Sequence, residues 1–187
     1  MKLLLYFYST TITIIVLVSC SLQEMPQKSQ SSTEQLTQPQ LKVVTLDDKS
    51  KIAMGQFIYV PIYSHIYYEN KHKVLDLSAT LSIRNTDLNN PIIITSVRYY
   101  DTGGKLIKQY LERPVELSSL ASTDFVVERT DTSGGLGANF IVEWVAEKEV
   151  SAPVVEAVMI NAVSNQGISF ISTGKVIKSH GKKNPKE

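Results

Sequence analysis

Few side chains in this sequence have the types and spacing that catalysis or metal binding requires. His180 belongs to the predicted tail, and His65 and His72 have no cysteine or ordered carboxylate at ligand spacing, so we expect no zinc site. No G-x-S-x-G segment of a serine hydrolase occurs, and Ser64 beside His65 is interpreted as a solvated turn pair. The glycine-rich segment DTSGGLGAN, residues 131–139, lacks the Lys-Ser/Thr of a phosphate-binding loop. The sequence therefore predicts no catalytic residue, no metal and no cofactor.

Aromatic and oxygen-bearing side chains give a weaker signal, for ligand contact. Tyr67 and Tyr68 belong to a group of tyrosines that precedes the first clear strand. A tyrosine ring at the rim of a sheet can stack on a sugar or a peptide while its hydroxyl forms a hydrogen bond, although tyrosine is also a common strand residue. Asp131 and Asn139 could offer oxygens to calcium, but their spacing matches no standard calcium loop. These four residues are our candidate ligand contacts.

The single cysteine of the 187-residue chain gives the clearest indication of chemistry. Cys20 follows Lys2 and an uncharged stretch, residues 3–18, a combination typical of an export signal. The run LVSC, residues 17–20, resembles the bacterial lipobox, which implies removal of a signal peptide, residues 1–19, and diacylation of the thiol. Two or three acyl chains hold a protein stably at a membrane. An uncleaved amino-terminal anchor, or a plain secretory signal with an incidental cysteine, is the alternative.

Two terminal segments are predicted to lie outside the fold. Residues 20–41 comprise the lipidated cysteine and a Gln- and Ser-rich tether, whose few apolar side chains cannot offset the entropy of ordering it. Twenty such residues span roughly 25 Å in root-mean-square terms. Residues 179–187 contain Gly181 and Pro185 and no apolar side chain, so we expect a disordered basic tail.

Composition limits the remaining classes of function. The chain is 43% hydrophobic and 20% charged, which is ordinary for one globular domain. Its formal net charge of +1 argues against nucleic acid as a partner, because such proteins present a strongly basic surface. Five lysines and one glutamate follow from Lys175 onward, so the preceding body is mildly acidic.

The body, residues 55–178, shows a hydrophobic period of two, which is typical of strands with one buried face. The clearest alternation lies between Leu75 and Arg84, and Trp144 stands in mid-strand. Gly103 and Gly104 are expected to form a tight hairpin turn. The eight predicted strands are residues 57–63, 75–84, 91–101, 105–111, 123–129, 138–146, 154–163 and 168–177.

Short strands at this spacing, with no helical stripe of more than two turns, predict an all-β fold. We expect a single antiparallel β-sandwich, immunoglobulin-like in architecture, with about 7–8 strands; a small barrel is the alternative. Since the only cysteine precedes the body, packing must replace the disulfide of an antibody-type domain.

Several segments of the body resemble a known family. They are IYVPIYSHIY, LSATLSIRNTD, ITSVRYYDTGGKLIKQYL, ASTDFVVERTDTSGGLGANFIVEW and VEAVMINAVSNQGISFIS. Together they are similar to the bacterial domain-of-unknown-function family 3124 over about residues 56–174. The resemblance implies an exported or lipid-anchored envelope protein without an established activity, and it transfers no catalytic residue.

These observations favour a lipid-anchored envelope protein that faces the periplasm or the exterior. Ser21 follows the lipidated cysteine where enteric-type sorting reads Asp as an inner-membrane signal, so the outer membrane is favoured. We expect a binding or structural module without catalysis, whose loops or edge strand contact an envelope protein or cell-wall glycan. An envelope hydrolase or other enzyme with an unrecognised site is the alternative, and a subunit of a larger complex is a third.

Overall fold

The alternating pattern of the body produces strands alone. The computed structural model describes residues 41–46, 51–69, 73–162 and 167–181, and within these ranges it has thirteen strands and no helix. The described ranges therefore contain no helix that could span a membrane. All of them belong to one unit, Gln38–Glu187. The predicted signal peptide, Cys20 and nearly all of the predicted tether lie outside the described residues.

The larger sheet has seven strands in the order β1-β8-β6-β10-β2-β13, and β7 pairs with β6 beside this path. Its strands are β1 (Lys42–Val43), β2 (Met54–Pro61), β6 (Ile92–Tyr100), β7 (Leu106–Gln109), β8 (Val115–Leu117), β10 (Asn139–Ala146) and β13 (Lys175–Gly181). The interior position of β6 explains why its sequence starts with apolar residues on both faces. Ile92 and Ile94 are fully buried, and Ile93 on the opposite face is 8% exposed.

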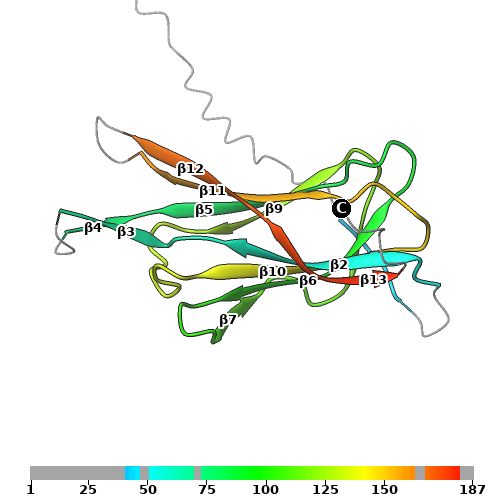
Figure 1. Ribbon diagram of the computed structural model, residues 1–187, viewed down its shortest axis with the longest axis horizontal. Helices are drawn as coiled ribbons and strands as arrows, with labels where there is room; N and C mark the ends of the chain where they lie inside the picture. Colours follow the sequence, from blue (N-terminus) through cyan, green and yellow to red (C-terminus); the bar gives the residue numbers. More distant parts are fainter. Residues whose placement is uncertain (1–40, 47–50, 70–72, 163–166, 182–187) are drawn as a thin grey trace, which may run out of the picture. The chain divides into compact units, whose positions relative to one another are not determined.

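The second sheet has four strands in the order β12-β11-β5-β9, and β3 and β4 form a separate two-stranded ribbon. These strands are β3 (His65–Tyr68), β4 (Lys73–Asp76), β5 (Ser78–Arg84), β9 (Ser122–Val127), β11 (Val154–Asn161) and β12 (Ile168–Thr173). Figure 1 shows the two larger sheets as two layers, one above the other. All pairings are antiparallel. The fold is an antiparallel β-sandwich, as the sequence predicts.

The core lies between the two layers and is built by the alternation. Leu81 and Ile83 from β5 are completely buried, and so are Phe140 and Trp144 from β10. Each such side chain contributes about 1.5–3 kcal/mol of hydrophobic free energy on burial. Trp144 and Tyr99 are the largest fully buried side chains of the described residues. Aromatic packing therefore occupies the centre of the sandwich.

The predicted count of 7–8 strands is too low, because two predicted strands bend and change sheets. The strand predicted at 75–84 breaks at Leu77, whose N–H donates to the Ser64 carbonyl at 2.8 Å. The strand predicted at 168–177 breaks at Gly174, whose N–H donates to the Val155 carbonyl at 2.8 Å. β1, β3 and β8 have two to four residues each, too few to show alternation in the sequence.

The turn predicted at Gly103 and Gly104 is confirmed. Gly104 has a φ of +79°, which costs glycine little and most other residues more. Its N–H donates to the Asp101 carbonyl at 3.0 Å, and the Asp101 carboxylate accepts a hydrogen bond from the Lys105 N–H at 2.8 Å. The pairing of β6 with β7 follows from this turn.

The predicted start of the basic tail, at residue 179, is too early, because β13 continues to Gly181. Ser179, His180 and Gly181 are part of β13, where they pair with Gln56, Gly55 and Met54 of β2. The His180 ring also lies 5.3 Å from the Phe57 ring, between centroids. Backbone pairing with β2 thus orders a segment that has no apolar side chain of its own. Residues 182–187 lie outside the described residues.

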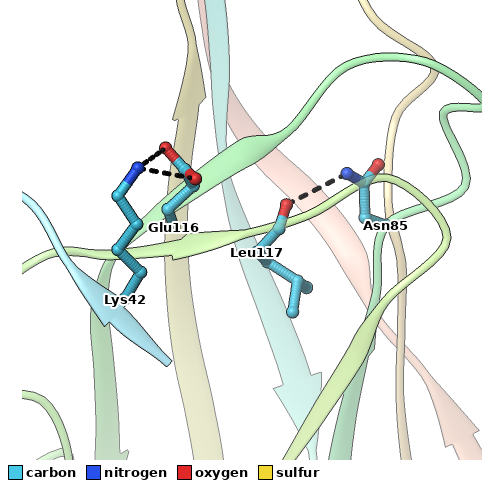
Figure 2. Close-up of polar contacts among 4 residues, drawn as sticks. All are labelled: Lys42, Asn85, Glu116 and Leu117. Carbon is cyan, nitrogen blue, oxygen red and sulfur yellow. Dashed lines mark hydrogen bonds and ion pairs between the residues drawn. The ribbon is translucent and has the colours of Figure 1, made fainter. Parts of the chain in front are cut away.

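Asn85 joins the loops at one end of the sandwich. This buried side chain ends β5, and its Nδ2 donates to the carbonyls of Leu117 at 3.2 Å, Ser118 at 3.0 Å and Asn90 at 2.9 Å. Figure 2 shows the bond to Leu117 beside the ion pair of Lys42 with Glu116, 3.2 Å long, which joins β1 to β8. The β5–β6 and β8–β9 connections are therefore held together by one amide.

Candidate functional site

The two-stranded ribbon of β3 and β4 carries an exposed aromatic surface. We call the described residues of this ribbon, with Tyr63 before it, the aromatic hairpin. Tyr67 is 44% exposed and Tyr68 is 46% exposed, although both lie in a paired strand. Successive residues of a strand point to opposite faces, so the two rings face opposite sides of the ribbon. The sequence places these tyrosines before the first clear strand; the structure places them on a strand.

Neighbouring side chains hold these rings in place. The His65 ring meets the Tyr67 ring edge to face, with centroids 5.6 Å apart. The Lys73 ammonium lies 5.7 Å from the centre of the Tyr68 ring and forms an ion pair with Glu69 at 2.7 Å. Amphipathic rings that are partly fixed before binding lose little conformational entropy when a ligand stacks on them. The aromatic hairpin therefore has the chemistry of a stacking surface.

A third aromatic contact joins the hairpin to the four-stranded sheet. The Tyr63 and Phe170 rings meet edge to face with centroids 5.9 Å apart, which links the start of the hairpin to β12. Tyr63 is 36% exposed and Ile168 of β12 is 39% exposed. This ring contact thus connects the segment before β3 to β12.

The glycine-rich loop, residues 131–137, packs against the base of the aromatic hairpin. Ser64 is fully buried there: its N–H donates to the Gly135 carbonyl at 3.1 Å, and its Oγ accepts from the Gly135 N–H at 2.8 Å. Thr102 holds the other side, with Oγ1 donating to the Gly134 carbonyl and accepting from the Gly137 N–H, both at 2.9 Å. Ser64 is therefore not the solvated turn residue that the sequence suggests.

Asp131 and Asn139 occupy structural positions at this loop. The Asp131 carboxylate accepts hydrogen bonds from the N–H and the hydroxyl of Ser133, which closes a local turn. Asn139 begins β10, where it pairs with Pro61 on one side and Tyr100 on the other. No contact joins either residue to Tyr67 or Tyr68 in the described ranges. Their role in ligand contact stays a prediction.

The sequence does not single out Tyr99, which is fully buried near the loop, or Tyr110, which is partly buried. Burial, followed by the nearby charge of Asp131, raises the pKa of Tyr99 to about 12. Burial, followed by the proximity of Tyr99, raises the pKa of Tyr110 to about 12. Both rings pack on Phe140, at centroid distances of 5.5 and 5.8 Å. The Tyr99 hydroxyl lies directly against Gly134 of the loop, whereas the Tyr110 hydroxyl donates to the Val126 carbonyl of β9 at 2.9 Å.

A cavity of about 340 Å³ lies at the other end of the sandwich. Glu147 and Lys148, which line the cavity, directly follow the last residue of β10. The glycine-rich loop precedes the first residue of β10, so the cavity and the loop lie at opposite ends of this strand. The remaining lining residues come from three further segments of the chain: Val44, Thr45, Leu46, Asn90, Pro91, Ile93 and Glu116. Lys42 already pairs with the Glu116 carboxylate (Figure 2). No local sequence pattern could reveal a cavity assembled from four segments.

The described residues bring no three His, Cys, Asp or Glu side chains together as metal ligands. The polar groups described so far bond mainly to one another, within loops and turns. Tyr67 and Tyr68 remain open to solvent on the aromatic hairpin, beside the exposed ion pair of Lys73 with Glu69. Fold and surface together define a β-sandwich that presents an aromatic hairpin.

Comparison with known proteins assigns the family. The chain belongs to DUF3124, a family described as "Protein of unknown function", whose model matches residues 55–177. The match confirms the resemblance seen in the sequence. Among solved structures, the crystal structure of Thermotoga maritima 1070 aligns with a TM-score of 0.39 and 12% sequence identity, over 64% of this chain and 92% of that chain. No curated protein matches the sequence.

Proposed function

We propose that this protein is a lipid-anchored bacterial envelope module that binds a partner through its aromatic hairpin. The anchor would be Cys20, after removal of residues 1–19, and Ser21 favours the outer membrane. The protein would face the periplasm or the exterior. Cell-wall glycan is the partner that exposed tyrosine rings fit best, because such rings stack on the apolar faces of sugars.

The observation that carries this proposal is the position of the hairpin relative to the point where the chain enters the fold. Residues 41–46 enter the sandwich at the cavity end, since Val44, Thr45 and Leu46 line the cavity. The aromatic hairpin lies at the opposite end of β2 and β10. The eight residues of β10 span about 26 Å at 3.3 Å per residue. A chain tethered through residues 20–41 would therefore present the tyrosines away from its attachment point.

The anchor is tested by labelling with a fatty-acid analogue in the native host or a lipoprotein-processing host. We expect the full chain to take up label and to sediment with membranes. Cys20→Ser should lose both label and membrane retention, because the thiol is the acceptor. Label that survives in Cys20→Ser would refute lipidation at this residue.

Binding is tested by co-sedimentation with purified insoluble cell-wall polysaccharide. Tyr67→Ala combined with Tyr68→Ala should weaken retention by about two- to tenfold, because the ring on the face that meets the polysaccharide contributes roughly 0.5–1.5 kcal/mol of stacking. The double change removes this ring whichever face of the ribbon binds. Leu88→Ala is the matched control, since Leu88 is 72% exposed and follows the end of β5 that is remote from the hairpin. Equal retention of the double variant and the wild type would remove the hairpin from the proposal.

A further inference from the structure

The terminal strands of the two larger sheets differ in how their open edges are protected. An open edge is a template for pairing with another chain, and charged side chains, especially lysine, usually discourage it. β13 carries Lys175 and Lys178, and the two-residue β1 carries Lys42. β9 carries Asp124, and its Val126 carbonyl accepts a hydrogen bond from the Tyr110 hydroxyl at 2.9 Å.

β12 is the exception among these four strands. Its sequence, ISFIST, contains no charged residue and no proline, and four of its six residues are exposed. It pairs with β11 on one side and is the last strand of its sheet. Hence β12 combines an open edge with none of the usual protection.

The outer face of the four-stranded sheet also has exposed apolar side chains that end at β12. The strand register aligns Ile171, Val158, Thr80 and Val126 in one row across all four strands. Ile171 at the β12 end of the row is 62% exposed, and Val126 at the β9 end is 42% exposed. The row ends abruptly at β12, with its most exposed side chain at the open edge.

We propose that β12 pairs antiparallel with β12 of a second copy of this chain, with Ile171 opposite Ile171 on a two-fold axis normal to the sheet. This register places Ser169 opposite Thr173, so no charge faces a like charge. Outward residues stay outward in both copies, and the two apolar rows join across an eight-stranded sheet. A second copy fits because an uncharged strand is complementary to itself under this symmetry.

The size of the contact sets its strength. One pair of short strands buries less than the roughly 1,600 Å² of a standard stable interface, so the dimer is weak in dilute solution. Attachment of both copies to one membrane raises their effective concentration and favours pairing. Because the Phe170 ring of β12 contacts the Tyr63 ring of the aromatic hairpin, pairing also brings two aromatic hairpins to one assembly. The inference does not depend on the proposed glycan binding, since Tyr67 and Tyr68 lie outside β12.

The oligomeric state of the full chain tests this proposal. We expect sedimentation velocity in detergent micelles to show a dimer whose fraction increases with protein concentration. Ile171→Lys places two ammonium groups opposite each other on the axis and should leave only monomer. Val154→Lys is the control, because Val154 is 42% exposed on the same face but lies on β11, and it should dimerise like the wild type.

A cysteine variant tests the register. Ile171→Cys should form a disulfide-linked dimer in membranes under mild oxidation. Residues opposite each other on antiparallel strands have Cβ atoms about 4.5–5.5 Å apart, and a small shift of the two strands brings them within the roughly 3.5–4.5 Å of a disulfide. Val126→Cys, at the far end of the row, should form no disulfide-linked dimer under the same oxidation, and neither should the wild-type chain, which pairs without a covalent bond. A wild-type chain that is monomeric at every concentration overturns the proposal, as does a dimer unaffected by Ile171→Lys or a disulfide from Ile171→Cys to another protein. None of these results bears on retention by polysaccharide.

Discussion

At the scale of single residues, this sandwich depends on polar side chains that replace missing backbone pairing. Asn85 is 2% exposed, and besides its three donated bonds its Oδ1 accepts from the Asp87 N–H at 3.0 Å. Asp87 in turn caps its own loop. Buried carbonyl groups need hydrogen-bond partners, and an amide at the end of β5 supplies them for two connections at once.

Replacement of Asn85 by alanine leaves buried carbonyls, including that of Leu117, without their donor. Since each unsatisfied buried group costs about 1–3 kcal/mol, we expect Asn85→Ala to lower the free energy of unfolding by about 2–4 kcal/mol. Urea denaturation followed by circular dichroism measures this difference. Asn89→Ala, at an exposed position of the same loop, should change it by less than about 0.5 kcal/mol. Similar losses in both variants would contradict the role given to Asn85.

The lowered pKa of Asp87 leads us to expect that stability depends on pH. Its pKa is lowered from 3.8 to about 2, chiefly because its carboxylate accepts the Asn89 N–H, and then those of Ser151 and Asn90. A lowered native pKa stabilises the fold above pH 3.8, and this contribution disappears as pH falls towards 2. The melting temperature of Asp87→Asn should therefore lie below that of the wild type at neutral pH, and the difference should shrink towards pH 2. Glu147→Gln, at an exposed position, is the control; a difference independent of pH would refute the role of the charge.

At the scale of elements, the fold is decided where strands change sheets. Leu77 separates β4 of the hairpin ribbon from β5. Gly174 separates β12 from β13, which belong to opposite layers (Figure 1). A Cβ atom on Gly174 would stand 2.6 Å from Ile58 Cγ2 and 2.8 Å from the Val155 carbonyl oxygen. The crossing therefore needs a residue without a side chain.

Gly174→Ala should be destabilising, because the new methyl group would force apart the crossing strand and β2. Overpacking of this kind costs about 1–3 kcal/mol, which urea denaturation resolves. Gly167→Ala is a matched control, since its nearest contact would be the Asn161 carbonyl oxygen at 3.6 Å, an ordinary packing distance. We expect Gly167→Ala to keep nearly wild-type stability. A Gly174→Ala variant as stable as Gly167→Ala would show that the crossing tolerates a side chain.

At the scale of the whole domain, the two layers enclose one hydrophobic core. One core cluster contains residues from both sheets, including Leu81 from the four-stranded sheet and Trp144 from the larger one, and Phe170 packs against it. Shared packing of this kind couples the unfolding of the two sheets. It also replaces the disulfide of an antibody-type sandwich.

Trp144 reports on this coupling, because it is the only tryptophan and is fully buried. We expect its emission to shift to longer wavelength on unfolding, at the same urea midpoint as the loss of strand circular dichroism. Two coincident transitions indicate a single cooperative unit. Separate midpoints would show that one sheet unfolds without the other. Trp144→Phe serves as the blank for the fluorescence.

Much of the fold could be predicted because its determinants are local. The alternation between Leu75 and Arg84 depends on residues two positions apart. The turn at Gly103 and Gly104 depends on four consecutive residues. Short strands such as β1 and β3 could not be recognised, since two to four residues do not establish a period. The exposure of Tyr67 and Tyr68 could not be predicted either, because it depends on the ribbon that β3 forms with β4.

The sequence by itself determined the all-β class and the family, since each depends on residues close together or on segments that can be matched in order. The export-type amino terminus stays a prediction. Only the tertiary structure decided that Ser64 is buried against Gly135, 71 positions away, and that β12 keeps an open, uncharged edge. Those features arise from contacts between distant segments. Such contacts depend on which strands become neighbours, and alternation along one strand carries no information about the strand beside it.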